Sequence, residues 1–275
     1  MALRKKRLGV EKLEMSDLYV PLVGECGLEA GPERSREWVQ AACRPLGEEY
    51  GAVLERAFGE RWIDWLENKG KATGAYSSGC YDSPPYLLLN HHGKLDDAFT
   101  LAHEAGHSVH TWLANHAQPP EKAEYPIFLA EVASTVNELL LARHLLWEAK
   151  EAGVRAHLLN HLCDSFKGTI FRQVMFAEFE RDIHAAAERG EALVADGLCR
   201  EYAALNAAYY GPELEGDSGE ESPIAMEWAR IPHFYYDFYV YKYATSFCAA
   251  LVFARRIREG RGVEEYLGML RGGVS

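Results

Sequence analysis

The sequence predicts a mainly helical fold with one small β element. Apolar residues recur at helical spacing through several long segments, and only one short apolar run has the character of a strand. The chain has 275 residues, of which 48% are hydrophobic and 12% aromatic, so it can bury a sizeable core. Because no internal repeat or low-complexity linker divides it, we expect residues 1–275 to form one domain.

The first predicted elements are two helices and a strand. Residues 33–69 have a helical pattern that is interrupted near Pro45 and Gly47. The next stretch, KGKATGAYSSGCYDSPPYLLLNHHG, is rich in turn-forming residues around the apolar run Tyr86–Leu89. We expect this run to be the one convincing strand of the protein.

Two long helices are predicted next. The first covers residues 97–116, with Asp96 or Asp97 at its N-terminal cap and an end before Pro119. The second begins with a proline and covers residues 126–149, most of which are apolar. Such a helix is expected to be largely buried.

The C-terminal half is predicted to be helical as well. Helices are expected over residues 157–189 and 197–210, and a glycine follows each of them. The acidic loop GPELEGDSGEESP then leads to the last long helix. We predict this helix over residues 232–258, because the proline at its start suits a first helical turn.

Charge and cysteine content argue against several classes of function. The net charge of −12 argues against nucleic acid or an anionic membrane as a partner, because both repel an acidic surface. The basic start MALRKKRLGV has no apolar segment after it, and no uncharged run approaches the roughly 18 residues of a membrane span. The six cysteines form no CxxC pair, which favours reduced thiols in a cytoplasmic protein.

The stretch LAHEAGHSVH, residues 101–110, carries the strongest chemical signal. His103 and His107 are one helical turn apart, so their imidazoles can meet one metal ion at about 2.0–2.1 Å. Glu104 lies between them, where a carboxylate can act on water as a general base. This is the HExxH arrangement of the zincins. His110 is about 10.5 Å from His103 along the helix axis, so we interpret it as a neighbour of the site.

The third metal ligand is predicted on the second long helix. A histidine six residues after His107 would supply it in the metzincins, but that position is Leu113. The stretch FLAEVASTVNELLLA instead places Glu131 and Glu138 on a polar or small stripe of an apolar helix. Because an unpaired buried carboxylate is costly, we expect Glu131 to be the third ligand. Glu138 is expected to accept a hydrogen bond from a ligand histidine. A solvent-facing stripe is the alternative.

Beyond these residues, the sequence resembles oligoendopeptidase F, in the thimet-oligopeptidase-like group of zinc peptidases. The matching stretches are DDAFTLAHEAGHSVH, IFLAEVASTVNELLL, FRQVMFAEFE and RIPHFYYDFYVYKYATS, in the family's order, and they span nearly the whole chain. The resemblance implies a zincin-like helical catalytic domain with one zinc ion per chain. It also implies hydrolysis of short unstructured oligopeptides inside a deep channel.

The resemblance further implies residues that stabilise the oxyanion. In the wider group these are a histidine and tyrosines downstream of the zinc site, which here would be His233 and the tyrosines after it. On a helix, Tyr236, Tyr239 or Val240, and Tyr243 would share one face. We favour His233, Tyr236 and Tyr243. The alternative is that this tyrosine-rich helix is aromatic core.

The strand before the zinc helix is a candidate substrate-binding element. The segment GAYSSGCYDSPPYLLLN resembles the family's segment at this place. Its residues Tyr86, Leu87 and Leu88 could pair with the backbone of an extended peptide, which would explain binding that tolerates many sequences. A purely structural strand is the alternative.

The chain departs from the family in length, because family members are roughly twice as long. The opening ALRKKRLGVEKLEMSDLYVPLV resembles an internal segment, and the end, YLGMLRGGVS, stops where the family continues. We therefore expect a catalytic domain that is truncated at both ends and lacks the family's N-terminal lobe. Its partners would be that lobe as a separate chain, or further copies in a homo-oligomer.

These expectations combine into zinc-dependent amide hydrolysis. Zinc held by His103, His107 and Glu131 would activate a water molecule, and Glu104 would transfer its proton to the leaving amine. The alternative is a zinc-binding fragment without activity, or half of a split enzyme that needs the missing lobe. A structural zinc site is disfavoured, because such sites are closed to water.

Overall fold

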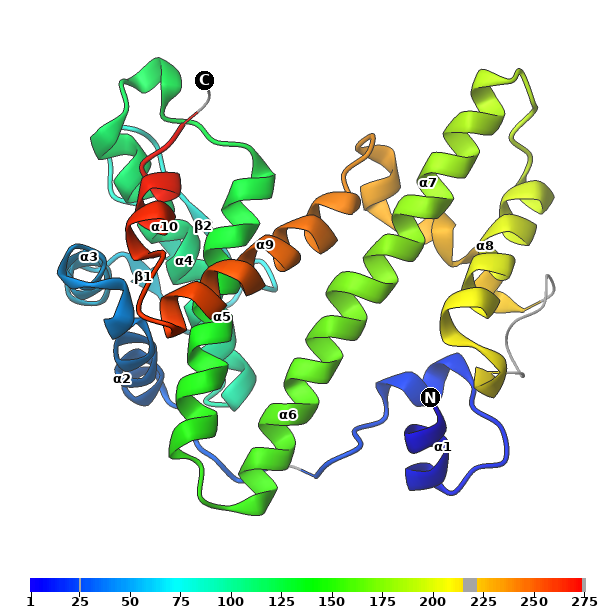
Figure 1. The fold of residues 1–275 in the computed structure, drawn as a ribbon, viewed down its shortest axis with the longest axis horizontal. Coiled ribbons are helices and arrows are strands. Elements are labelled where there is room, and N and C mark those ends of the chain that lie inside the picture. The colour runs from blue at the N-terminus through cyan, green and yellow to red at the C-terminus, as the bar shows by residue number, and fades with distance from the viewer. Residues whose placement is uncertain (25, 215–221, 274–275) are drawn as a thin grey trace. The chain divides into compact units, whose positions relative to one another are not determined.

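The computed structural model describes residues 1–24, 26–214 and 222–273. Helices form most of this part of the chain, beside one small three-stranded sheet (Figure 1). The predicted fold class, mainly helical with a small β element, is therefore confirmed. No helix in the described ranges is long and apolar enough to cross a membrane.

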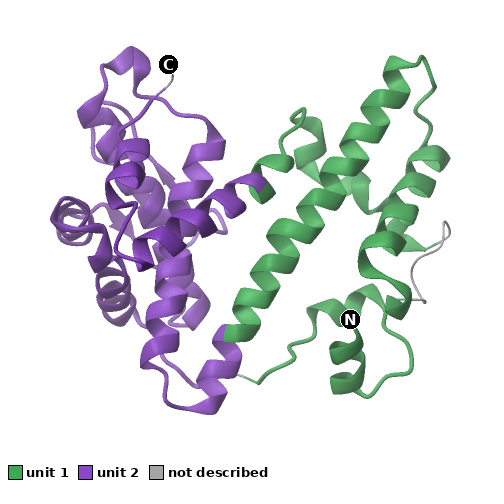
Figure 2. Ribbon diagram, in the orientation of Figure 1, with its two compact units in different colours: residues 1–24, 159–244 green, residues 25–158, 245–275 purple. Residues whose placement is uncertain are grey.

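The chain forms two compact units (Figure 2). Unit 1 consists of residues 1–24 and 159–244, and unit 2 of residues 25–158 and 245–275. The expectation of a single domain over residues 1–275 stays a prediction. The predicted metal ligands belong to unit 2, and the predicted oxyanion-stabilising residues belong to unit 1.

Unit 2 is built around two long helices, α4 (Leu95–Ala117) and α5 (Ile127–Glu148), which match the two helices predicted there. Asp97 stabilises the start of α4, because its Oδ2 accepts hydrogen bonds from the backbone N–H groups of Lys94 and His92 at 2.8 and 2.9 Å. Three further helices contact this pair: α2 (Pro32–Cys43), α3 (Glu48–Gly59) and α10 (Val263–Leu270).

The region predicted as helical over residues 33–69 is helical only as far as Gly59. The predicted break lies at Gly47, whose φ of 89° is a conformation that favours glycine. After α3 the chain turns at Arg61, which has a φ of 62°, and forms strand β1 (Ile63–Asp64). A left-handed residue cannot continue a right-handed helix, and an arginine gives no sign of such a turn in the sequence.

The sheet has the strand order β1-β3-β2, with β2 at Tyr76–Ser78 and β3 at Tyr86–Leu88. β3 is the predicted strand, and it lies in the middle. It pairs in parallel with β1 and antiparallel with β2, where Ser77 is opposite Leu87. β2 also contacts α4. It is therefore an edge strand that lies next to the HExxH helix.

A long helix dominates unit 1. α6 (Ala152–Phe166) continues through one π-helical turn, Lys167–Phe171, into α7 (Arg172–Glu188). The predicted helix over residues 157–189 is thus present, but it contains a turn with an extra residue. π-helical turns are rare and are found mostly as single insertions of this kind.

Unit 1 also contains α1 (Ala2–Leu8) and α8 (Ala195–Tyr210). α8 packs against α7 and is close to the predicted helix over residues 197–210. Of the predicted acidic loop, residues 215–221 lie outside the described residues. One hydrophobic cluster joins α7, α8 and the segment before α9, and its buried members are Met175, Phe176, Phe179, Tyr202, Ile231 and Val240.

The prediction of a helix starting at residue 232 is wrong in its first part. The chain forms a short 3₁₀ turn, Pro232–Tyr235, then an irregular segment, and α9 begins only at Tyr241 and ends at Arg258. Asp237 and Phe238 have φ values of 35° and 52°. Two consecutive residues in this region interrupt a right-handed helix.

Candidate active site

Helices α4 and α5 pack closely together at Gly106. A Cβ atom there would lie 2.7 Å from the Cα of Ser134 and 2.8 Å from the carbonyl oxygen of Ala133. Real Cβ atoms do not make such short contacts with backbone, so any other residue would push the helices apart. The short approach brings the HExxH residues of α4 towards the polar stripe of α5.

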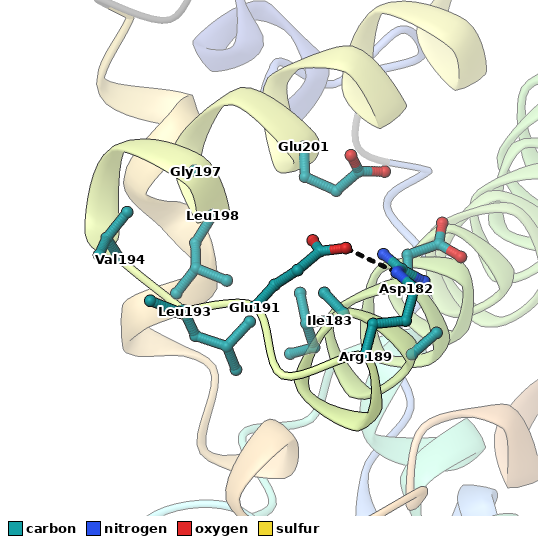
Figure 3. Close-up of a pocket in the computed structure, with 12 residues that line it drawn as sticks. Asp182, Ile183, Arg189, Glu191, Leu193, Val194, Gly197, Leu198 and Glu201 are labelled. Atoms are coloured by element: carbon teal, nitrogen blue, oxygen red, sulfur yellow. Dashed lines mark hydrogen bonds and ion pairs between the residues drawn. The ribbon is translucent and has the colours of Figure 1, made fainter.

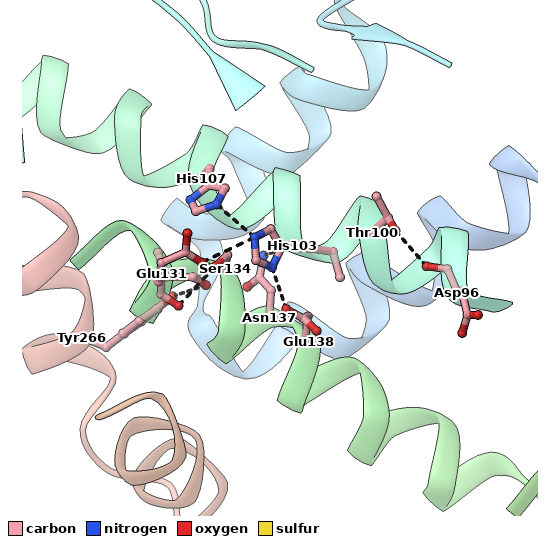
Figure 4. Close-up of polar contacts among 11 residues, drawn as sticks. Asp96, Thr100, His103, His107, Glu131, Ser134, Asn137, Glu138 and Tyr266 are labelled. Carbon is pink, nitrogen blue, oxygen red and sulfur yellow. Dashed lines mark hydrogen bonds and ion pairs between the residues drawn. The ribbon is translucent and has the colours of Figure 1, made fainter. Parts of the chain in front are cut away.

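The three predicted metal ligands lie together at this crossing (Figure 4). The Nε2 atoms of His103 and His107 are 3.1 Å apart, and Nε2 of His103 is 3.7 Å from Oε2 of Glu131. One ligand atom from each residue lies within 4.8 Å of the others. Ligand atoms of a tetrahedral zinc ion lie about 3.3 Å apart when each is 2.0–2.1 Å from the metal. The donor set therefore fits a single zinc ion.

Glu138 orients the first histidine of this set. Its Oε1 lies 2.6 Å from Nδ1 of His103, which leaves Nε2 of that ring facing His107 and Glu131. Burial alone would lower the pKa of His103, but the hydrogen bond and charge of Glu138 outweigh it and raise the pKa to about 9. Burial, followed by the neighbouring charge of His103, lowers the pKa of His107 to about 3.

Glu104 is buried beside the ligands with one oxygen unused. Glu104 is 7% exposed, and its Oε2 has no hydrogen-bond partner among the described residues. Burial raises the pKa of Glu104, while the charge of His103 and a hydrogen bond from the backbone of Ser77 act against this. An unpartnered buried carboxylate oxygen is costly unless a bound molecule completes its contacts. Glu104 can therefore accept a proton from a molecule held at the ligands.

His110 lies outside this set of donors. Its ring stacks on Tyr125 with the centroids 3.6 Å apart, and neither ring nitrogen has a partner in the described part of the chain. Burial lowers the pKa of His110 to about 3, so the ring is neutral near pH 7. This packing agrees with its interpretation as a neighbour of the site.

The substrate-binding strand needs a correction. Tyr86, Leu87 and Leu88 form β3, whose backbone pairs with β1 on one side and β2 on the other. Within the described ranges β3 therefore has no open edge for a peptide, and the pairing expected of it is wrong. The strand with an open edge near the donor set is β2, whose Ser77 backbone is hydrogen-bonded to Glu104.

The predicted oxyanion-stabilising residues lie in or beside residues 231–240 of unit 1, which we call the aromatic loop. The hydroxyl of Tyr243 is 3.3 Å from Nε2 of His233. The ring of Tyr239 lies beside both, with centroid distances of 5.4 Å to His233 and 5.6 Å to Tyr243. Tyr236 is 65% exposed, and its ring centroid is 6.1 Å from that of Tyr239. The four side chains are thus neighbours, although no continuous helix holds them.

Asn137 and Gly106 contribute to the packing of α4 against α5, and the sequence analysis does not predict this role for either residue. Asn137 is fully buried, donates through Nδ2 to the carbonyl oxygen of Ala102 at 3.0 Å, and accepts from the hydroxyl of Tyr50 at 2.7 Å. It thereby joins α3 and α5 to α4, one residue before His103. Two features of the sequence could have indicated these residues. Asn137 is a lone amide in an apolar helix, and Gly106 is a glycine in the middle of a helix.

A separate cavity of about 340 Å³ lies between α7 and α8 in unit 1 (Figure 3). Its polar wall includes the ion pair of Arg189 with Glu191, at 2.6 Å, and Leu193 and Leu198 contribute apolar surface. None of the predicted site residues lines this cavity. It is therefore distinct from the donor set.

Known proteins are similar to this chain in sequence and in fold. A model described as Peptidase family M3 matches residues 27–275. Oligopeptidase PepF of Bacillus subtilis (strain 168) is 44% identical over 277 residues, which are 100% of this chain and 41% of that protein. The chromosomal oligoendopeptidase F of Lactococcus lactis subsp. cremoris is 46% identical over 279 residues, covering 99% of this chain and 45% of the relative. The crystal structure of oligoendopeptidase-F from Enterococcus faecium has 39% identity and a TM-score of 0.71, and the match covers 100% and 41% of the two chains.

The chain spans less than half the length of each of these relatives. The family match nevertheless includes α4, α5 and the aromatic loop, which carry the donor set and the group around His233. The resemblance to oligoendopeptidase F that the sequence motifs predict is confirmed. The chain belongs to peptidase family M3.

Proposed function

We propose that this chain is the catalytic part of a zinc-dependent endopeptidase that hydrolyses short unstructured oligopeptides. The observation that carries the proposal is the convergence of three donor atoms beside Glu104, whose buried Oε2 has no partner in the described part of the chain. Family membership supports the broader class, a peptidase. The relatives' names, oligopeptidase and oligoendopeptidase F, support a substrate of short peptides.

His103, His107 and Glu131 would hold one zinc ion per chain. When bound, zinc supplies a Lewis acid that polarises the scissile carbonyl and makes water acidic enough to lose a proton near pH 7. Glu138 would accept the Nδ1–H of His103 and so keep its Nε2 free for the metal. Asn137 and Gly106 would keep α4 and α5 at the separation that this donor set needs.

Glu104 would be the general base and then the general acid. Its free oxygen would take a proton from the attacking water as the oxygen of that water bonds to the scissile carbon. The same carboxyl would then give the proton to the amide nitrogen as the carbon–nitrogen bond breaks. One peptide bond and one water become a carboxylic acid and an amine, which ionise near pH 7 to a carboxylate and an ammonium group, and Glu104 returns to its starting state.

The resemblance supplies the remaining roles in this proposal. His233, Tyr236 and Tyr243 would donate hydrogen bonds to the oxyanion that develops on the substrate. The contact between His233 and Tyr243 supports their acting together, whereas the exposure of Tyr236 makes its role the weakest of the three. An extended substrate would pair with the edge strand β2, in place of Tyr86–Leu88 of β3.

Glu104→Gln is the experiment that tests this function. The amide keeps the shape of the side chain but cannot take a proton, so kcat for an internally quenched peptide should fall by about 10²–10⁴. Zinc content should not change, because Glu104 is not a ligand in this proposal. Asp96→Asn, at an exposed position on the same helix, is the matched control. A Glu104→Gln chain that cleaves normally after removal of contaminating proteases would refute the assignment.

The second candidate is a chain that does not cleave peptides on its own. The chain would then be a zinc-binding fragment, or half of an enzyme that is completed by a separate N-terminal lobe or by further copies of itself. A folded, zinc-loaded chain that cleaves only after addition of the N-terminal part of a relative would establish this candidate.

The location proposed is the cytoplasm, and the six free cysteines support a reducing compartment.

A further inference from the structure

Glu180 is a buried carboxylate that has no role in the mechanism above. It lies on α7 and is 1% exposed. Its Oε1 accepts a hydrogen bond from the backbone N–H of Phe238 at 2.6 Å. Glutamate is almost never buried to this degree unless a partner satisfies it. Here the partner is a main-chain group at the centre of the aromatic loop.

The backbone at this partner is in an unfavourable conformation. Asp237 and Phe238 have φ values of 35° and 52°, a region that bulky residues such as phenylalanine rarely adopt. Such conformations persist only where the surroundings hold them, and they are concentrated at functional sites. Phe238 is held by the hydrogen bond to Glu180 and by its ring, whose centroid is 4.4 Å from that of His184.

The two ends of the aromatic loop are anchored independently of Glu180. Ile231 and Val240 are buried in the hydrophobic cluster that includes Phe176 and Phe179 of α7. Phe234 packs on the same cluster. Glu180 therefore holds the turn at residues 237–238, in a segment that is otherwise attached to the helix by apolar contacts. Burial raises the pKa of Glu180, and the hydrogen bond from Phe238 acts against this by favouring the ionised carboxylate.

We propose that Glu180 is a positioning residue: it holds the turn at residues 237–238 and thereby keeps His233 and Tyr243 in the arrangement that peptide hydrolysis requires. The proposal rests on the proposed function, because the roles of those two side chains are themselves proposals. Without the acceptor, Phe238 would relax to a negative φ and carry Tyr239 and Tyr243 with it. A displacement of about 1 Å in such groups can reduce turnover about a hundredfold.

The test compares Glu180→Leu with Glu180→Gln. Leucine removes the acceptor, whereas glutamine retains a carbonyl oxygen at the same reach. Glu178→Gln is the matched control, because Glu178 lies on the same helix but accepts from the hydroxyl of Tyr209 at 3.0 Å. Two measurements are made on the zinc-loaded chain. One is the rate of hydrogen exchange of the Phe238 amide, and the other is kcat and KM for an internally quenched peptide. If circular dichroism shows that Glu180→Leu does not fold, Glu180→Asp replaces it, because the shorter side chain withdraws the acceptor.

We expect the Phe238 amide to exchange at least about tenfold faster in Glu180→Leu, and at an unchanged rate in Glu180→Gln and the control. The kcat of Glu180→Leu should fall by about ten- to a hundredfold with little change in KM or zinc content. Unchanged exchange would overturn the proposal, and so would faster exchange with an unchanged kcat. If the unsubstituted chain does not cleave the peptide, the proposed function fails, and the exchange result alone decides whether Glu180 holds the turn.

Discussion

The two units hold their candidate functional side chains by different means. Unit 2 carries the donor set on two regular helices, α4 and α5, that meet closely at Gly106. Unit 1 carries His233 and Tyr243 on either side of an irregular segment with two residues of positive φ. Regular helices convert sequence spacing directly into geometry. A loop needs additional contacts, here those of Glu180 and Val240, to define its shape.

Glu227 of unit 1 and Glu131 of unit 2 differ in the groups that face their carboxylates. In unit 1, Glu227 pairs with Arg172 at 2.7 Å, with the hydroxyl of Tyr202 at 2.7 Å and with Arg230. In unit 2, the one cationic group within ion-pair distance of Glu131 in the described ranges is His103, at 3.7 Å. A carboxylate that faces histidines and is not matched by arginine or lysine suits a site that receives a cation. Glu227 therefore belongs to a structural ion pair, whereas the surroundings of Glu131 support the proposed role as a metal ligand.

The largest expected effect comes from removing the carboxylates of unit 2. Glu131→Gln should lower zinc affinity by more than about a hundredfold, because it replaces a charged carboxylate donor with a neutral amide oxygen, and Glu138→Gln by about ten- to a hundredfold. Competition with a chromophoric chelator measures both. Glu148→Gln, on the same helix with a side chain that is 52% exposed, is the control. Equal affinity in Glu131→Gln and the control would show that the carboxylates of unit 2 are structural, as in unit 1.

A smaller effect is expected at the helix crossing. Gly106→Ala places a Cβ against the backbone of α5, so it should destabilise the chain by about 1–3 kcal/mol and weaken zinc binding. Chemical denaturation and the chelator assay measure the two effects. Gly51→Ala is the matched control: Gly51 lies in α3 and a Cβ there meets nothing within 4 Å, so alanine should stabilise slightly. If both variants behave alike, close approach at Gly106 does not define the donor set.

The smallest effect is expected at Glu227, and it depends on pH. Burial alone would raise the pKa of Glu227, but the hydrogen bonds from Arg172 and Tyr202 outweigh it and lower the pKa below its ordinary 4.5. A carboxyl group whose pKa is lowered in the native state stabilises that state above its unfolded pKa. This contribution is lost as the pH falls through the native pKa.

Glu227→Gln should therefore cost about 1–3 kcal/mol at pH 7 and less below pH 4. Thermal unfolding at a series of pH values measures this, with Glu191→Gln, in an exposed pair with Arg189, as a control that should change little. A penalty that does not shrink in acid would show that Glu227 is not ionised in the native state.

The sequence predicts the regular helices of the fold well and the irregular segments poorly. α4 and α5 agree with the predicted helices because their apolar periodicity is long and clear. The failures lie at Arg61 and at Asp237–Phe238, where non-glycine residues take positive φ values that only tertiary contacts impose. Strands of two or three residues, such as β1 and β2, are likewise defined by their partners and carry no local pattern.

For the candidate site, helical spacing predicted the pair His103 and His107, and the cost of a buried carboxylate predicted Glu131 beside them. The structure places the three together, although their role as ligands stays a prediction. The same reasoning failed for the tyrosines, because it assumed a helix that is absent between Tyr236 and Val240. The position of β3 in the middle of its sheet could not be predicted either, since strand order depends on contacts between distant segments.

The π-helical turn at Lys167–Phe171 has a consequence for insertions and deletions. One extra residue rotates everything after it by about 100° around the helix axis relative to an uninterrupted α-helix. Deleting a single residue there would leave the helix intact and rotate Phe176, Phe179 and Glu180, with the loop that packs on them, relative to α6. We therefore expect this turn to tolerate neither insertion nor deletion of a residue, although none of its residues is buried.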